Sequence, residues 1–158
     1  MYKVALVEDD KKLLKLLSIL IETTDEFELA GTYHSGNLFL NDFKSLDVDV
    51  VIMDIQMPGK TGIECIKEAK AKKPNVQFIV STAFDNQEYI FQSLCAGATG
   101  YLLKTEKPER ICDAINDVMN GGSPMTQSIA RKVVGSFFKP TTNNAAELIS
   151  EREKEIVQ

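Results

Sequence analysis

The feature that most constrains the fold is a short apolar run followed at once by an acid and a turn. Val50–Met53 are all apolar, Asp54 follows them, and Pro58-Gly59 then turns the chain. An uninterrupted apolar run of this length is typical of a strand buried on both faces, as in parallel sheets. Pro-Gly favours a tight turn. The segment therefore predicts a central parallel strand with a carboxylate at its carboxyl end.

Strand and helix patterns alternate along the first three quarters of the chain. Such alternation predicts βα units and an α/β fold with a doubly wound, five-stranded parallel sheet. Pro108 suits the first turn of the last helix in this region, and Gly121-Gly122 suit its end. The expected strands span 3–7, 27–33, 50–53, 76–83 and 100–104. The expected helices span about 10–21, 36–43, 62–72 and 87–96, with a fifth after Pro108.

Acidic residues follow two of these strands. Glu8-Asp9-Asp10 come after the first strand, and Asp54 ends the third. Ligands of open α/β sheets bind at the carboxyl ends of the strands, so these acids should converge. Converging carboxylates raise one another's pKa, and a hard divalent cation such as Mg²⁺ relieves that repulsion. A helix N-cap with acids in the first turn is the structural alternative, and we expect that role for Asp10.

Two further strand ends carry groups that bind anions. The fourth strand ends in Ser81-Thr82, and the fifth ends in Lys104. Each residue alone is common on protein surfaces. Together with a metal ion, a lysine and a hydroxyl can neutralise and hold the oxygens of a phosphoryl group. The four strand ends therefore predict a phosphoryl-binding site.

These segments together resemble the receiver domain of response regulators in two-component systems, over residues 1–122. The matching segments, in order, are Leu6–Asp10, Met53–Gly59, Ser81–Ala83 and Ala96–Lys104. The resemblance implies a flavodoxin-like (CheY-like) fold. It also implies a signalling domain rather than an enzyme, with chemistry limited to its own phosphorylation and dephosphorylation.

The resemblance further implies a role for each site residue. Asp54 would accept a phosphoryl group from a sensor histidine kinase. The Mg²⁺ ligands would be Glu8, Asp9, Asp54 and the backbone carbonyl of Gln56. Lys104 would hold the phosphoryl group, and the switch pair would be Thr82 and Tyr101. Phosphorylation would promote a homodimer.

Two side chains near the site are expected to set the lifetime of the phosphoryl group. Gln56 and Phe84 lie two residues beyond Asp54 and Thr82, where they could position or exclude the hydrolytic water. Phe84 is bulky and apolar. We therefore predict slow self-dephosphorylation.

The chain changes character after Gly122. Residues 123–146 read as a linker that contains a helix, with an apolar stripe at Ile129, Val133 and Phe137. Residues 147–158 resemble the start of a LuxR-type helix-turn-helix output domain of NarL/FixJ-type regulators. A generic capped helix explains the same residues. We expect DNA binding only through that output domain, whose recognition helix is missing from these residues.

Composition limits the other functions. The net charge of −5 and the absence of a basic stripe outside the third helix argue against nucleic-acid binding by these residues. No signal peptide or membrane-length apolar segment is evident. The three cysteines, Cys65, Cys95 and Cys112, lack metal-ligand spacing, which predicts reduced thiols in the cytoplasm.

Three questions stay open at this point. A haloacid dehalogenase-like phosphatase also uses an aspartyl nucleophile, but it needs an acid two residues later, where Gln56 stands. A stand-alone receiver, which signals through protein contacts or acts as a phosphate sink, is the alternative to a transcription regulator. The helix at 87–96 is apolar nearly all round, which predicts either core packing alone or contact with a partner.

Overall fold

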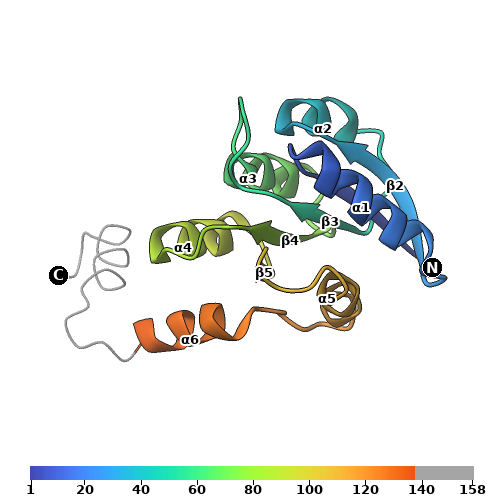
Figure 1. Cartoon of the computed structure of the whole chain (residues 1–158). Coiled ribbons are helices and arrows are strands. Elements are labelled where there is room, and N and C mark those ends of the chain that lie inside the picture. The colour runs from blue at the N-terminus through green and yellow to red at the C-terminus, as the bar shows by residue number, and fades with distance from the viewer. Residues whose placement is uncertain (138–158) are drawn as a thin grey trace.

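A five-stranded parallel sheet forms the middle layer of the molecule, with strand order β2-β1-β3-β4-β5 (Figure 1). The structure is a computed structural model and describes residues 1–137. The strands are β1 (Tyr2–Val7), β2 (Phe27–Tyr33), β3 (Val50–Met53), β4 (Gln77–Thr82) and β5 (Gly100–Leu103). All four strand pairings are parallel, so the carboxyl ends of all five strands point the same way.

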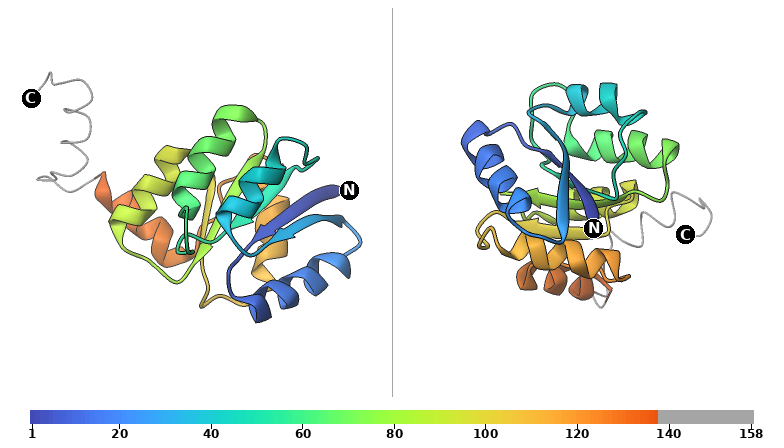
Figure 2. Two further views of the ribbon diagram at one scale, coloured as in Figure 1. Left: turned by 90° about the horizontal axis from the view of Figure 1, so that it is seen from above. Right: turned by 90° about the vertical axis from the view of Figure 1, so that its right-hand side faces the viewer.

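Helices cover both faces of this sheet (Figures 1 and 2). One face carries α1 (Lys11–Glu22) and α5 (Arg110–Met119). The other face carries α2 (Gly36–Phe43), α3 (Gly62–Lys72) and α4 (Gln87–Ala96). A sixth helix, α6 (Gln127–Ser136), lies beside α4 at the β5 edge of the sheet. The doubly wound α/β architecture expected from the sequence is confirmed.

Side chains alternate between the two faces, and each face has its own apolar core. In β1, Ala5 and Val7 belong to the core under α2, α3 and α4, whereas Val4 and Leu6 belong to the core under α1 and α5. Because successive strand residues point to opposite faces, continuous apolar strands fill both cores. Burial on both faces fixes the positions of the strand ends, and it therefore fixes where the loops after them begin.

The β3–α3 loop is held by local interactions of its backbone. Thr61 accepts the backbone N–H of Glu64 at 3.2 Å, and the Glu64 carboxylate accepts the N–H of Thr61 at 2.9 Å, so a capping box begins α3. A Cβ at Gly62 would lie 2.0 Å from the carbonyl oxygen of Asp54. Only glycine therefore lets the start of α3 approach the backbone of Asp54 so closely.

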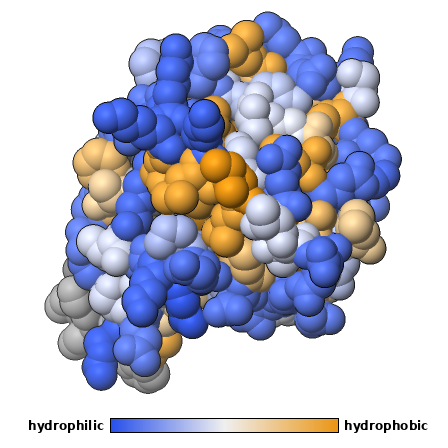
Figure 3. Space-filling view, turned by 45° about the vertical axis from the view of Figure 1, so that its right-hand side comes forward, coloured by the Kyte–Doolittle hydropathy of each residue, from blue (hydrophilic) through white to orange (hydrophobic). Residues whose placement is uncertain are grey.

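Leu16 departs from the apolar pattern of α1. Its spacing from Leu13 and Leu20 favours the buried face, but Leu16 is 49% exposed, and Leu17 and Ile21 are buried instead. A space-filling view shows apolar side chains gathered within a largely polar face (Figure 3). Among residues 1–137, no helix is long and apolar enough to cross a membrane. The expected linker segment beyond residue 137 and the expected output-domain start lie outside the described residues.

Candidate functional site

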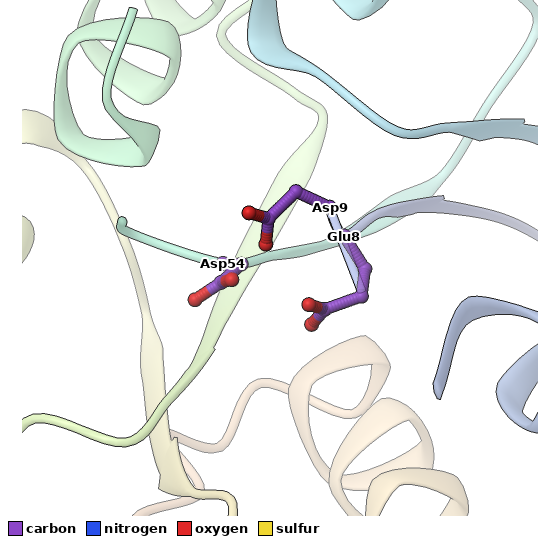
Figure 4. A group of neighbouring side chains, drawn as sticks. All are labelled: Glu8, Asp9 and Asp54. Atoms are coloured by element: carbon purple, nitrogen blue, oxygen red, sulfur yellow. The ribbon is translucent and has the colours of Figure 1, made fainter. Parts of the chain in front are cut away.

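Three carboxylates meet at the carboxyl edge of the sheet. Glu8 and Asp9 follow β1, Asp54 follows β3, and one carboxylate oxygen from each lies within 4.8 Å of the others. Glu8 and Asp54 are buried, at 3% and 5% exposure, whereas Asp9 is exposed. Figure 4 shows the side chains of Asp9 and Asp54 close to each other across the two loops. The structure thus brings together the acids that the sequence predicted would converge.

Asp10, the third acid of that run, has a structural role. Its side chain accepts the backbone N–H groups of Lys12 at 3.0 Å and Leu13 at 3.3 Å, so it caps α1. The N-cap role expected for Asp10 is confirmed. Its neighbour Glu8 also accepts the Asp10 N–H, at 3.1 Å. The cap therefore fixes the loop that carries the two site acids.

Lys104 is the cation of this crevice. Its Nζ lies 2.8 Å from Glu8 Oε1 and 3.2 Å from Asp54 Oδ2. Its backbone N–H donates to the carbonyl of Thr82 at 2.8 Å, which fixes the end of β5 against the end of β4. The other oxygen of Asp54, Oδ1, accepts the N–H of Ile55 at 2.8 Å. One lysine therefore joins two of the three carboxylates.

Burial and charge shift the ionisation of this cluster. Burial, followed by the negative charge of Glu8, raises the pKa of Asp54 to about 7, although Lys104 opposes the shift. Burial lowers the pKa of Lys104, but Glu8 and Asp54 more than compensate and raise it above its ordinary value. Lys104 therefore stays charged, while the acids remain short of positive charge.

The donor set fits a hard divalent cation. Mg²⁺ is bound in proteins by a few carboxylates and completes its coordination with water or phosphate oxygens. Glu8, Asp9 and Asp54 supply such carboxylates at one place, with Asp9 open to solvent. Burial is the main reason that the pKa of Asp54 is raised, and repulsion from Glu8 adds to it. A single lysine does not neutralise three carboxylates, so a cation would relieve that repulsion.

The two expected switch residues lie on neighbouring strands. Thr82, at the end of β4, is buried, and its Oγ1 accepts the N–H of Phe84 at 3.4 Å. Tyr101 of β5 is fully buried, and its hydroxyl donates to the carbonyl of Phe84 at 2.7 Å. Burial raises the pKa of Tyr101 well above its ordinary value, so the hydroxyl remains a donor. The Tyr101 ring therefore lies inside the domain, and its hydroxyl is held by the β4–α4 loop.

The two expected lifetime residues are joined by a third side chain. Gln56 Nε2 donates to the hydroxyl of Tyr89 at 2.8 Å, and the ring of Phe84 packs edge-on against the Tyr89 ring with centroids 5.6 Å apart. Tyr89 belongs to α4 and was not among the predicted site residues. Its signal in the sequence was weak, because a tyrosine in an apolar helix is usually core.

A doubly wound sheet with an acidic crevice and a lysine at its carboxyl edge defines the class of two-component signalling domains. The chain belongs to the response regulator receiver domain family, whose description matches residues 4–116. It is therefore a signalling protein.

Several of its relatives are transcription regulators. The chain is 32% identical to the transcriptional regulatory protein YxjL of Bacillus subtilis, with 99% of this chain and 73% of that protein covered. It is also 32% identical to the transcriptional regulatory protein DesR of Bacillus subtilis, with 100% of this chain and 74% of that protein covered. The chain is thus a receiver homologous to transcriptional response regulators of two-component systems.

Solved structures show the same fold. A LuxR-family two-component response regulator from Aurantimonas sp. SI85-9A1 matches with a TM-score of 0.82 at 21% identity. The match covers 88% of this chain and 99% of that chain. It therefore extends beyond the sheet domain and into the segment that contains α6.

Proposed function

We propose that Asp54 accepts a phosphoryl group from a sensor histidine kinase and that the phosphorylated chain controls transcription. The observation that carries this proposal is the placement of Asp54. Its carboxylate is nearly buried, lies beside two other acids, and has Lys104 Nζ at 3.2 Å from Oδ2. The names of the relatives support an output in transcription, rather than the stand-alone receiver that was the alternative.

The transfer is an in-line substitution at phosphorus. An oxygen of Asp54 attacks the phosphorus atom, the phosphorus–nitrogen bond of the phosphohistidine breaks, and the imidazole leaves with the electron pair. Lys104 then has an anionic oxygen to hold in place of part of its contact with Asp54. Bound Mg²⁺, held by Glu8, Asp9, Asp54 and the Gln56 carbonyl, would supply positive charge to the phosphoryl oxygens.

The phosphoryl group would act on the switch pair. It brings about −1.5 to −2 charges into the crevice at neutral pH, as phosphate monoesters do. The Thr82 hydroxyl oxygen accepts a long bond from the Phe84 N–H, and its own O–H can donate to a phosphoryl oxygen. Moving a two-state element from mostly inactive to mostly active needs about 5.5 kcal/mol of differential interaction. Metal, lysine and hydroxyl contacts together are of that order.

The direct test is phosphorylation of the Asp54→Asn variant with acetyl phosphate and Mg²⁺. The wild-type chain should gain the mass of one phosphoryl group, and the variant should gain none. Asp10→Asn is the matched control, because Asn caps a helix as well as Asp and the neighbouring acid is changed without touching Asp54. A stable phosphoryl group on the Asp54→Asn chain would reject Asp54 as the acceptor.

The lifetime of that group should depend on Phe84. Its ring is 38% exposed and packs on Tyr89, which places an apolar surface near the crevice. Phe84→Glu should shorten the lifetime because a carboxylate can orient the hydrolytic water, whereas Phe84→Leu should leave it nearly unchanged. Equal lifetimes for the Glu and wild-type chains, measured by loss of the mass increment, would remove Phe84 from this role.

The remaining parts of the proposal concern organisation. We propose a receiver over residues 1–122, a linker over 123–146, and the beginning of an output domain from 147, through which DNA would be contacted. Phosphorylation would favour a homodimer, which analytical ultracentrifugation with and without acetyl phosphate can detect. All three cysteines are free, which supports a reducing, cytoplasmic setting.

A further inference from the structure

Three side chains connect the two loops that flank Asp54. Gln56 lies in the β3–α3 loop, Phe84 in the β4–α4 loop, and Tyr89 in the first turn of α4. Gln56 Nε2 donates to the Tyr89 hydroxyl at 2.8 Å, and the Phe84 ring meets the Tyr89 ring edge-on, with centroids 5.6 Å apart. Because β3 and β4 are neighbours in the sheet, these three side chains form a bridge between the loops, the rim bridge.

Tyr89 is the fixed member of the rim bridge. Its side chain is partly buried and packs against the apolar cluster beneath α2, α3 and α4. The next residue, Ile90, is fully buried in that cluster. The helix that carries both residues contacts α6 as well as the core, which accounts for its nearly continuous apolar sequence. Tyr89 therefore presents a polar tip at the surface on a rigid apolar body.

Among residues 1–137, the Gln56 amide has one hydrogen-bond partner, the Tyr89 hydroxyl. Gln56 is exposed, although Ile55 and Met57 on either side of it are buried. A hydroxyl both donates and accepts, so the link holds for either orientation of the amide. A long side chain at the surface would otherwise sample several rotamers. The hydroxyl of Tyr89 therefore decides where the Gln56 amide lies.

The direction of this link matters for the chemistry at Asp54. Two acids that follow β1 reach Asp54 from one side, whereas Tyr89 holds the Gln56 side chain on the opposite side, toward α4. Asp54 is only 5% exposed, while Gln56 and Phe84 are open to solvent. Water that reaches a phosphoryl group on Asp54 therefore passes the outer side chains of these two loops.

We propose that Tyr89 is a positioning residue that slows hydrolysis of phosphorylated Asp54 by holding the Gln56 amide away from the attacking water. The proposal rests on the function proposed for Asp54. In hydrolysis, the water oxygen bonds to phosphorus, the bond from phosphorus to the Asp54 oxygen breaks, and its electron pair returns to the carboxylate. The water gives up one proton to solvent, and inorganic phosphate leaves. An amide turned toward that water can accept one of its O–H groups and orient it, whereas an amide held at α4 does not reach it.

The test compares how fast chains phosphorylated with acetyl phosphate and Mg²⁺ lose the mass increment once the acetyl phosphate is removed. Tyr89→Phe removes the hydroxyl but keeps the ring, so the contacts with Phe84 and with the apolar cluster remain. We expect this variant to lose the phosphoryl group about three- to tenfold faster than the wild-type chain, the range that one hydrogen bond gives. Tyr33→Phe is the matched control, because the Tyr33 hydroxyl bonds to Asp42 of α2 and to neither loop. Its rate should equal that of the wild-type chain.

A double-mutant cycle separates positioning of the amide from a general loosening of the fold. In a Gln56→Ala chain no amide remains for Tyr89 to hold, so adding Tyr89→Phe should change the rate by less than about twofold. A looser fold would instead speed the reaction by the same factor in both backgrounds. An unchanged or slower rate for Tyr89→Phe alone, or equal acceleration with and without the Gln56 amide, would overturn the proposal.

Two further readings distinguish the role of Tyr89 from the function proposed for Asp54. Mg²⁺ affinity should be the same in the wild-type and Tyr89→Phe chains, because the link involves the side chain of Gln56 and not its backbone carbonyl. A rate change that follows a change in Mg²⁺ affinity would place the effect at the cation and would reject Tyr89 as a positioning residue. A wild-type chain that gains no phosphoryl group would reject the function proposed for Asp54, and the role of Tyr89 with it. A phosphorylated wild-type chain whose lifetime does not respond to Tyr89→Phe would reject the role of Tyr89 alone.

Discussion

The carboxylate crevice and the face where α6 covers β5 treat their polar groups in opposite ways. In the crevice three carboxylates lie together, one lysine contacts Glu8 and Asp54, and burial, followed by the charge of Glu8, raises the pKa of Asp54 to about 7. On the covered face, residues 124–136 form a cover that supplies partners to the N–H groups of Tyr101 and Leu103 and closes off the apolar side chains around them. The carboxylates of the crevice are not neutralised by the chain's own cation, whereas the N–H groups of the covered face have hydrogen-bond partners within the chain.

This difference shows how the molecule separates stability from function. Negative charge that the crevice leaves without a partner destabilises the folded chain. Binding of a cation and a phosphoryl group removes this destabilisation, and the free energy gained contributes to their affinity. The covered face gives stability in the same way as an ordinary core. Five changes to the chain or its solution test the contrast, from the largest expected effect on stability to the smallest.

The largest effect should come from the covered face. Ile129→Ala should lower the free energy of unfolding by about 2 to 4 kcal/mol, because it removes a fully buried side chain and leaves a cavity. Urea denaturation monitored by circular dichroism measures this loss.

Val134→Ala on the same helix is the matched control. Val134 is 56% exposed, so its truncation should change the free energy of unfolding by less than about 0.5 kcal/mol. Equal effects for the two variants would mean that α6 is not docked as the structure shows, and the contrast between the two regions would fail.

A substitution in the crevice should stabilise the folded chain instead of destabilising it. Without divalent cations at pH 7, Asp54→Asn should raise the free energy of unfolding by about 1 to 2 kcal/mol, since a neutral amide removes a buried charge near Glu8. This is less than the full pKa shift would give, because Lys104 screens the acid and the crevice opens to solvent. A destabilised Asp54→Asn chain would show that the crevice is not short of positive charge.

The pH dependence follows from the same shift. The folded chain holds the Asp54 proton up to about pH 7, whereas an unfolded chain loses it near pH 3.8, the ordinary pKa of an aspartate. Between these limits the folded state binds more protons, so its stability falls as the pH rises. The advantage of Asp54→Asn should therefore shrink as the pH is lowered from 7 toward 4, in denaturation series at matched ionic strength.

Bound Mg²⁺ should turn the carboxylate cluster of the wild-type chain from a destabilising feature into a stabilising one. At a free Mg²⁺ concentration ten times the dissociation constant, binding should add about 1.4 kcal/mol to the free energy of unfolding. Asp9→Asn should lose most of this gain, and Asp10→Asn should keep it, because Asp10 caps α1. Thermal unfolding across a Mg²⁺ series distinguishes the two. The same response in both variants would place the cation elsewhere.

The sequence was sufficient for the crevice because each of its residues ends a strand. Val50–Met53 must be buried on both faces, so Asp54 must stand at the carboxyl edge, and Lys104 reaches the same edge by the same rule. Because these polar residues directly follow apolar runs, the sequence alone identified them as candidate site residues. Apolar runs, apolar spacing and turn residues likewise predicted all eleven elements within the described residues.

The covered face could not be derived in that way. The contact of Lys132 with Asp85 joins positions 47 apart in the sequence, and no local pattern pairs them. The Tyr101 ring lies in one apolar cluster with Ile129 of α6, and Tyr89 looks like any core aromatic. Leu16 fits an apolar stripe, yet it is half exposed because α1 is rotated toward Ile21. Long-range pairing and helix rotation are tertiary properties that a single sequence leaves open.

The smallest of the effects tests one hydrogen bond of the cover. Thr126→Val keeps the shape of the side chain but removes the oxygen that accepts the Leu103 N–H. The free energy of unfolding should fall by about 1 kcal/mol, at the low end for an unpaired amide, since Leu103 is only half-buried and water can replace the hydroxyl. Thr99→Val, at the other end of β5, removes only a side-chain contact with Gln77 and should cost less. Exchange of the Leu103 amide should speed up in the first variant alone. If both variants behave alike, the cover is held by apolar packing, and its backbone pairing with β5 adds nothing.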